Sequence, residues 1–154
     1  MIKQKVLFVC IHNSARSQMA EALLNHLAGD RFMAESAGLE PGTLSPLAVD
    51  AMEAIGINIA GKKTRSAFDL FKEGKMYQYV IAVCDEASER CPVFPSALER
   101  LSWSFPDPST LSGTNEQKLE KTIKIRDQIA RRIEEWLIEV TGSKTGRVEL
   151  TNPN

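Results

Sequence analysis

The sequence predicts an α/β fold of three layers, in which a four-stranded parallel sheet is flanked by helices. Two short apolar, β-branched runs, 5–10 and 79–84, have the composition of strands buried on both faces. Segments with the apolar spacing of helices lie between them, and strands that alternate with helices favour a parallel sheet. A length of 154 residues fits a single domain.

Four segments are expected to form the strands. Besides the two apolar runs, we expect a strand over 31–37 and a fourth over 101–105. The carboxyl ends of parallel strands share one edge of the sheet, where ligands bind at the switch point. Cys10, Cys84 and the loop after 105 are therefore expected to meet in one crevice.

The helices are predicted from apolar stripes and capping residues. Apolar side chains recur every fourth position over 19–27, and Gly29 follows as a C-cap. Ser45 precedes a proline, and this pair is typical of a helix N-terminus. The helix that begins there is expected to end near Gly56. A shorter helix is expected over 66–72.

The final helix begins at a capping box and defines the expected end of the domain. Thr114 and Gln117 have the spacing of this box, and apolar residues continue at helical spacing to Gly142. We therefore expect one domain over 1–142, while 143–154 is expected to form a polar C-terminal tail.

Composition excludes several classes of protein. The formal net charge of −1 gives no positive field for nucleic acid. The apolar run 6–11 is far shorter than the roughly 20 residues of a membrane-spanning helix. The N-terminal residues lack the apolar core of a secretory signal. We expect a cytoplasmic monomer with no nucleic-acid or membrane partner.

Three cysteines, Cys10, Cys84 and Cys91, are the only ones in the chain. An odd number in a cytosolic chain argues against a structural disulfide framework. A cysteine in such a protein is often a small buried apolar residue. The spacing of Cys84 and Cys91 is too wide for the usual paired zinc ligands, so redox or nucleophilic chemistry has to be judged from context.

The loop after the first strand contains cysteine, five further residues and arginine. Cys10 ends a strand and Arg16 begins a helix, so the backbone N–H groups between them can surround an oxyanion. The guanidinium adds a planar fork for a tetrahedral anion. The same positive surroundings favour a thiolate at Cys10, so this loop predicts both anion binding and a nucleophile.

Other residues of the loop have two interpretations. Asn13 tolerates a left-handed backbone, and Ser17 can donate a hydrogen bond to the thiolate. Helix capping is the alternative role for Ser17 and for Ser14. His12 is interpreted as a loop residue, because a thiolate needs no separate base.

The run Cys-Ile-His-Asn-Ser-Ala-Arg-Ser-Gln-Met-Ala-Glu at 10–21 resembles the phosphate loop of low-molecular-weight protein-tyrosine phosphatases. It resembles still more closely the arsenate reductases built on that fold, and the similarity extends over about 5–141. The resemblance implies that Cys10 is the nucleophile. It also implies an oxyanion site formed by Ile11, His12, Asn13, Ser14, Ala15 and Arg16.

Cys84 and Cys91 separate the two activities. The thioredoxin-coupled arsenate reductases use three cysteines in relay, and this chain resembles them in their number, location and Cys-x6-Cys-Pro spacing. The resemblance implies that Cys84 attacks the Cys10–arsenic adduct and that Cys91 then attacks Cys84. Thioredoxin, rather than glutaredoxin, is the implied reductant.

Asp107-Pro108 resembles the general-acid loop of the family. A carboxylic acid there can protonate the leaving oxygen, and the alternative role is that of an aspartate in a turn. Aromatic residues usually follow this pair in the tyrosine phosphatases, whereas Ser109 and Thr110 follow here. This difference favours a small inorganic oxyanion over phosphotyrosine.

Some members of the reductase family bind potassium beside the loop. Asn13, Glu21, Ser36 and Thr64 match that arrangement, and no other metal is expected. Ser66 stands where such members have an aspartate, so one charged ligand is missing.

Together these observations predict a cytoplasmic arsenate reductase that binds arsenate, with phosphate as its analogue. The alternatives are a phosphatase of the same fold that forms a Cys10 phosphocysteine, a phosphocysteine carrier in a sugar-transport relay, and a redox-sensing module without turnover.

Overall fold

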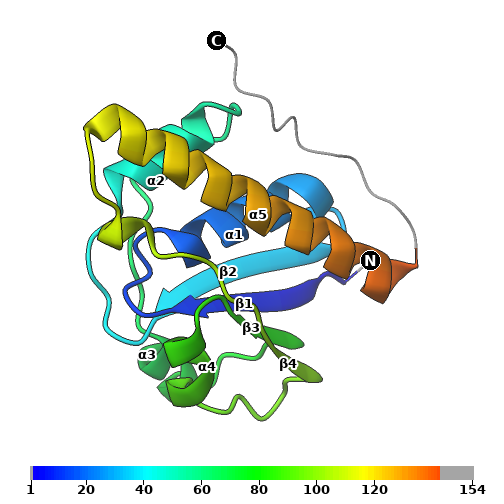
Figure 1. Ribbon diagram of the computed structural model, residues 1–154. Helices are drawn as coiled ribbons and strands as arrows, with labels where there is room; N and C mark the ends of the chain where they lie inside the picture. The colour runs from blue at the N-terminus through cyan, green and yellow to red at the C-terminus, as the bar shows by residue number, and fades with distance from the viewer. Residues whose placement is uncertain (1, 143–154) are drawn as a thin grey trace.

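A computed structural model describes residues 2–142 and contains one sheet of four parallel strands (Figure 1). Its strands are β1 (Gln4–Cys10), β2 (Phe32–Gly38), β3 (Tyr79–Ala82) and β4 (Glu99–Ser102). Its helices are α1 (Arg16–Ala28), α2 (Pro46–Glu53), α3 (Ala67–Lys72), α4 (Asp85–Arg90) and α5 (Asn115–Thr141), with a short 3-10 turn at Pro108–Thr110. The expected C-terminal tail, 143–154, lies outside the described residues.

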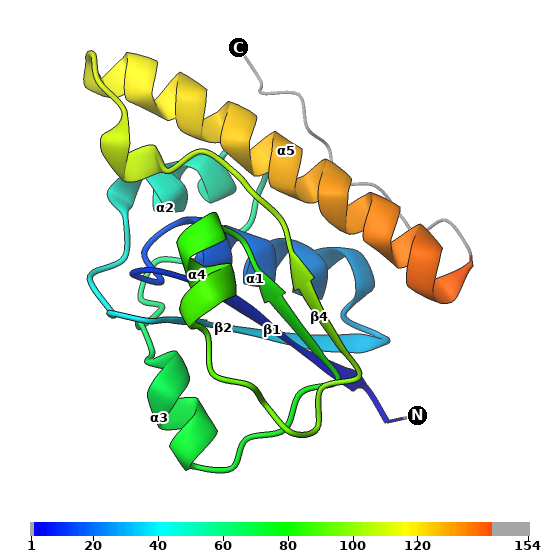
Figure 2. The ribbon, with the colours of Figure 1, turned by 60° about the horizontal axis from the view of Figure 1, so that its bottom comes forward.

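The strand order is β2-β1-β3-β4, and the helices cover both faces of the sheet. In Figures 1 and 2, α1, α2 and α5 lie on one face, and α3 and α4 lie on the other. The predicted three-layer α/β fold is therefore confirmed. Within the described part of the chain, no helix is long and apolar enough to cross a membrane.

One part of the core lies between the sheet and the long helix α5, which also packs against α1 and α2. Trp136 of α5 is 1% exposed, and its ring packs against Phe32, Tyr79 and Trp103 at centroid distances of 5.2, 5.1 and 6.4 Å. Aromatic rings at these distances combine a large buried area with favourable edge contacts. This layer holds α5 against the sheet and supports the strands that carry the site.

Capping residues set the helix boundaries largely as expected. The hydroxyl of Ser45 accepts the Ala48 N–H at 3.4 Å, and Ser66 caps α3. Both hydrogen bonds of the Thr114–Gln117 capping box are present, and Gly142 has the left-handed φ of 70° that ends α5. These local signals were sufficient because each depends on residues only a few positions apart.

Two predicted strands differ from the structure at their boundaries. β3 ends at Ala82, so Cys84 lies beyond it and forms the N-cap of α4. β4 spans Glu99–Ser102 instead of 101–105, because its register with β3 pairs Tyr79 with Glu99 and Ala82 with Ser102. Pairing with β3, which also has four residues, decides where this edge strand ends, and that partner is not encoded in the local pattern.

Candidate active site

The loop between β1 and α1 is held by the chain segment that follows β2. Four of its carbonyl groups accept backbone N–H groups from 39–45. These bonds are Leu39 to Cys10 (3.1 Å), Glu40 to Ile11 (2.7 Å), Gly42 to His12 (2.9 Å) and Ser45 to Ser14 (2.8 Å). Since the carbonyl groups are turned toward 39–45, the N–H groups of the loop can face the opposite side, as an anion nest requires.

Gly38, at the end of β2, lets that segment approach the loop. A Cβ atom at this position would lie 2.8 Å from the Asn13 nitrogen and 2.8 Å from the Ile11 oxygen. Both contacts are with backbone atoms, which cannot rotate away as a side chain would. The glycine is therefore required by the close approach of two backbones.

Cys10 is 3% exposed, and its sulfur lies inside this loop. It accepts the Asn13 N–H at 3.1 Å and lies 2.9 Å from the Ser17 hydroxyl oxygen. Asn13 has a φ of 56°, the left-handed conformation expected from its residue type. Two donors are thus aimed at one sulfur, and the thiolate is the form of a cysteine that attacks an electrophile.

The side chain of Asn13 sets the direction of a hydrogen-bond network that we call the loop network (Asn13, Ser17, Gln18 and Ser36). Its Oδ1 accepts the Gln18 side-chain amide at 3.2 Å and the Arg65 backbone N–H at 3.0 Å. Its Nδ2 therefore has to be the donor to Ser17 (2.7 Å) and Ser36 (3.0 Å). Each serine oxygen already accepts from Asn13, so the Ser17 hydroxyl is left to donate to Cys10.

Arg16 and Asp107 face each other at the open side of the loop. The Nη1 atom of Arg16 donates to the Phe105 carbonyl at 3.2 Å, and Nη2 lies 3.6 Å from Asp107 Oδ2. Burial opposes ionisation of Asp107, but hydrogen bonds from Ser109 and the charge of Arg16 outweigh it and lower the pKa of this carboxyl. In the free protein the pair is thus an ion pair near neutral pH.

Cys84 lies beside the same loop and is 6% exposed. Burial raises the pKa of its thiol, while the backbone N–H groups of Ala87 and Ile11 and the charge of Arg16 act in the opposite direction. The Ile11 contact places this sulfur against the loop that holds Cys10. It is a protonated thiol near neutral pH, and deprotonation there produces a nucleophile beside Cys10.

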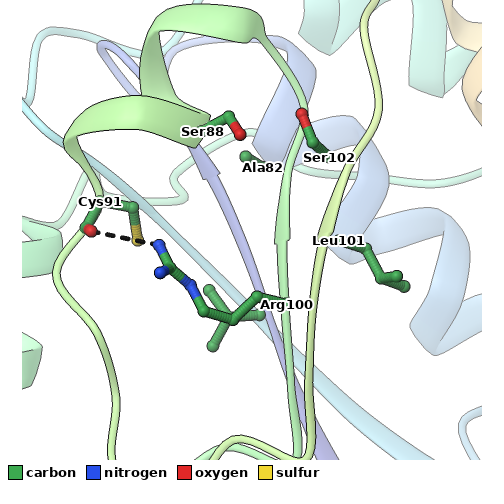
Figure 3. Close-up of a pocket in the computed structure, with 7 residues that line it drawn as sticks. Ala82, Ser88, Cys91, Arg100, Leu101 and Ser102 are labelled. Atoms are coloured by element: carbon green, nitrogen blue, oxygen red, sulfur yellow. Dashed lines mark hydrogen bonds between the residues drawn. The ribbon is translucent and has the colours of Figure 1, made fainter.

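Cys91 lies at the opposite end of α4 and is also buried, with 7% of its surface exposed. Burial raises the pKa of its thiol, and the nearby Arg100 guanidinium partly offsets this effect. Figure 3 shows Arg100 reaching from β4 toward Cys91, where its Nη2 atom donates to the Cys91 carbonyl at 3.3 Å. A cavity of about 200 Å³ separates this thiol from β3 and β4.

All three thiols are free in the structure, and two of them meet at the loop. The predicted convergence of Cys10, Cys84 and the loop of Asp107 at one edge of the sheet therefore agrees with the geometry. Cys91 does not join them, because α4 lies between it and Cys84. No group of three or more His, Cys, Asp or Glu residues within 2–142 could hold a metal ion.

Comparisons with known proteins place this fold and loop in a family. The family model described as low molecular weight phosphotyrosine protein phosphatase matches residues 5–145. The chain belongs to this family.

Similar members of the low-molecular-weight phosphatase family carry the name arsenate reductase. One from Shouchella clausii is 35% identical over 137 residues, which is 88% of this chain and 96% of that protein. One from Halalkalibacterium halodurans is 38% identical and covers 86% of this chain and 94% of its own. A solved structure of a Corynebacterium glutamicum thioredoxin-dependent arsenate reductase is 30% identical with a TM-score of 0.69, covering 92% of this chain and 64% of that one.

The residues predicted to bind potassium in this family member come together only in part. Ser36 links Asn13 to Glu21, since its hydroxyl donates to Glu21 Oε1 at 2.9 Å. The Thr64 hydroxyl instead donates to the Gly42 carbonyl at 2.7 Å. The ammonium group of Lys62 contacts the other oxygen of Glu21.

Sequence reasoning missed several residues that support the family's phosphate loop here. Gly38 directly follows the strand predicted over 31–37, and a glycine at that edge is a usable signal. Lys62 and Arg65 had no such signal, because each reaches its partner only through the folded chain. The same holds for Arg100, which lies beside Cys91 and not beside the loop.

Proposed function

We propose that this chain is an arsenate reductase that works through a relay of Cys10, Cys84 and Cys91. The observation that carries the proposal is the position of Cys84. A phosphatase needs one thiol, whereas here a second thiol lies against the oxyanion loop and a third follows one short helix later. Reduction of arsenate to arsenite requires two electrons, which a pair of thiols can supply.

The first step is attack of the Cys10 thiolate on arsenic. Arsenate is held by the N–H groups of 11–15 and by the guanidinium of Arg16, which is placed at the loop by its bond to the Phe105 carbonyl. A sulfur–arsenic bond forms as an arsenic–oxygen bond breaks, and the departing oxygen takes a proton and leaves as water. We propose Asp107 as the donor of this proton, because a bound anion that engages Arg16 weakens the ion pair that keeps the carboxyl ionised.

In the second step the Cys84 thiolate attacks the sulfur of Cys10. A sulfur–sulfur bond forms, the electron pair of the sulfur–arsenic bond passes to arsenic, and arsenite leaves. Arsenic is reduced from the +5 to the +3 state while two thiols become one disulfide. The Ile11 N–H and Arg16, which both favour the Cys84 thiolate, assist this attack.

In the third step the Cys91 thiolate attacks Cys84, which releases Cys10 as a thiolate and leaves a Cys84–Cys91 disulfide. Arg100 is the charged group that favours ionisation of Cys91. A dithiol protein then reduces this disulfide by the same exchange chemistry. We propose thioredoxin for this role, supported by the similarity to the thioredoxin-dependent reductase of C. glutamicum.

Phosphatase activity is the second candidate, and the match to the phosphatase family supports it only as a relative of the same fold. Phosphate and arsenate have the same charge and shape, so the loop is expected to hydrolyse small phosphate esters slowly. Ser109 argues against phosphotyrosine as the main substrate, because its hydroxyl binds Asp107 Oδ1 at 2.8 Å where an aromatic wall would be needed.

The cellular setting follows from the same chemistry. Three free thiols that cycle through a disulfide need a reducing compartment, which supports the cytoplasm as the site of action. We also propose that the protein acts as a monomer, with 1–142 as its catalytic domain and 143–154 as a polar tail.

The test is arsenate-dependent oxidation of NADPH in the presence of thioredoxin and thioredoxin reductase. Wild-type protein is expected to turn over repeatedly. Cys91→Ser is expected to release one arsenite per chain and then stop as a Cys10–Cys84 disulfide, and Cys84→Ser to release none. If the wild type does not turn over arsenate and all three proteins hydrolyse phenyl phosphate, the chain is a phosphatase.

A further inference from the structure

Glu21 is a buried carboxylate beneath the oxyanion loop, with only 2% of its side chain exposed. Its Oε1 accepts the Ser36 hydroxyl at 2.9 Å, and its Oε2 contacts the ammonium group of Lys62. The Nη2 atom of Arg65 lies 4.0 Å from Oε1. A carboxylate is buried at high energetic cost unless cations or donors compensate its charge, and here one segment, 62–65, supplies both cations.

These contacts do not fit a potassium ion. Both oxygens of Glu21 already have partners, and an added cation would lie beside an ammonium and a guanidinium group. The Thr64 hydroxyl donates to a carbonyl elsewhere, and the Ser66 hydroxyl caps α3 by accepting the Asp69 N–H at 3.2 Å. The oxygens expected to converge on an ion therefore serve other partners.

We propose that Lys62 is a positioning residue. Its ammonium group, which belongs to the chain itself, supplies the positive charge that a bound potassium ion would otherwise bring to Glu21. The consequence for Cys10 as the attacking thiol rests on the proposed function, whereas the contact between Lys62 and Glu21 does not. Because the charge is covalently attached, the reactivity of Cys10 is independent of the monovalent cation in solution.

The path from Lys62 to the nucleophile runs through the loop network. An ionised Glu21 can only accept, so the Ser36 hydroxyl has to donate to it. This leaves the Ser36 oxygen free to accept from Asn13, whose amide is thereby held with Nδ2 toward Ser17. Without a cation beside it the buried Glu21 carboxylate is uncompensated and moves, and the Asn13 amide loses one of the bonds that orient it.

The test measures the reactivity of Cys10 without arsenate. In a Cys84→Ser/Cys91→Ser parent, Cys10 is the only thiol, and its rate of alkylation by iodoacetamide near pH 7 is measured in KCl and in choline chloride of equal ionic strength. The parent is expected to react equally in both salts. Lys62→Met is expected to react about tenfold more slowly in choline chloride and to recover in KCl.

Three further variants separate charge from structure. Lys62→Arg should behave as the parent, because it keeps the cation. Lys63→Met is the matched control, since it removes the adjacent exposed lysine, which makes no ion pair with a described residue. Glu21→Gln/Lys62→Met removes both charges together, and its alkylation rate should return to within about threefold of the parent in both salts.

The proposal is overturned by a parent that reacts faster in KCl, because a cation site would then exist beside Lys62. It is also overturned if Lys62→Met reacts like the parent in choline chloride. If Lys62→Met does not fold by circular dichroism, the charge-balanced double variant decides, and a slow rate there contradicts the role assigned to Lys62. Arsenate is absent from these alkylation experiments. Their outcomes can therefore be told apart from a failure of the proposed reductase activity.

Discussion

Formation of the Cys84–Cys91 disulfide is expected to unwind α4. The two cysteines cap opposite ends of this helix, which spans Asp85–Arg90. Seven residues at a helical rise of about 1.5 Å separate their Cα atoms by about 10 Å, whereas a disulfide requires about 4.4–6.8 Å. The segment must shorten by about 4 Å, and a helix cannot be compressed by that amount.

The structure allows this change at low cost. A helix of six residues is marginal by itself, and Ala87 is its only buried side chain. The cavity of about 200 Å³ beside Cys91 leaves room under the helix for a rearranged chain. The backbone bonds from Ser88 N–H to the Cys84 carbonyl (3.2 Å) and from Cys91 N–H to the Ala87 carbonyl (3.0 Å) are expected to break.

Hydrogen exchange in a Cys10→Ser variant tests this expectation, because the variant can form only the Cys84–Cys91 disulfide. Amides of 85–91 are expected to exchange at least about tenfold faster after oxidation, as for a segment that opens locally. The buried strand β1 serves as an internal control and should not change. Equal exchange over 85–91 in protein shown by mass to contain the disulfide would refute the geometric argument.

Four other changes test the site and the core. Burial already raises the pKa of the Cys91 thiol, so Arg100→Met should raise it further by removing the opposing charge. Alkylation of that thiol should then need a higher pH than in the control Arg100→Lys, which keeps the charge. Gly38→Ala should displace the oxyanion loop and weaken phosphate binding, measured by calorimetry, by at least about tenfold, because a Cβ would meet backbone atoms at 2.8 Å. Asp107→Asn should slow arsenite release in a single turnover by about 10²-fold or more if the carboxyl delivers the proton. Leu23→Ala, at a position with 0% exposure, should lower the free energy of unfolding in urea by about 2–5 kcal/mol.

The chain itself determined the features that depend on neighbouring residues. The composition of 5–10 and 79–84 identified buried strands, and hydroxyl caps at Ser45 and Thr114 identified helix starts, because capping bonds join residues three positions apart. The oxyanion loop was equally local, since 10–17 contains the thiol, the backbone donors and the guanidinium in one turn of chain.

The folded structure decided what joins distant parts of the chain. Lys62 reaches Glu21 across 41 positions, and Arg16 reaches the Phe105 carbonyl across 89. Periodicity and capping carry no information about such pairs, because the order of strands and the packing of helices bring them together. The sequence thus predicted the loop that holds Cys10, whereas tertiary packing decided which charge lies beneath that loop and which cation compensates it.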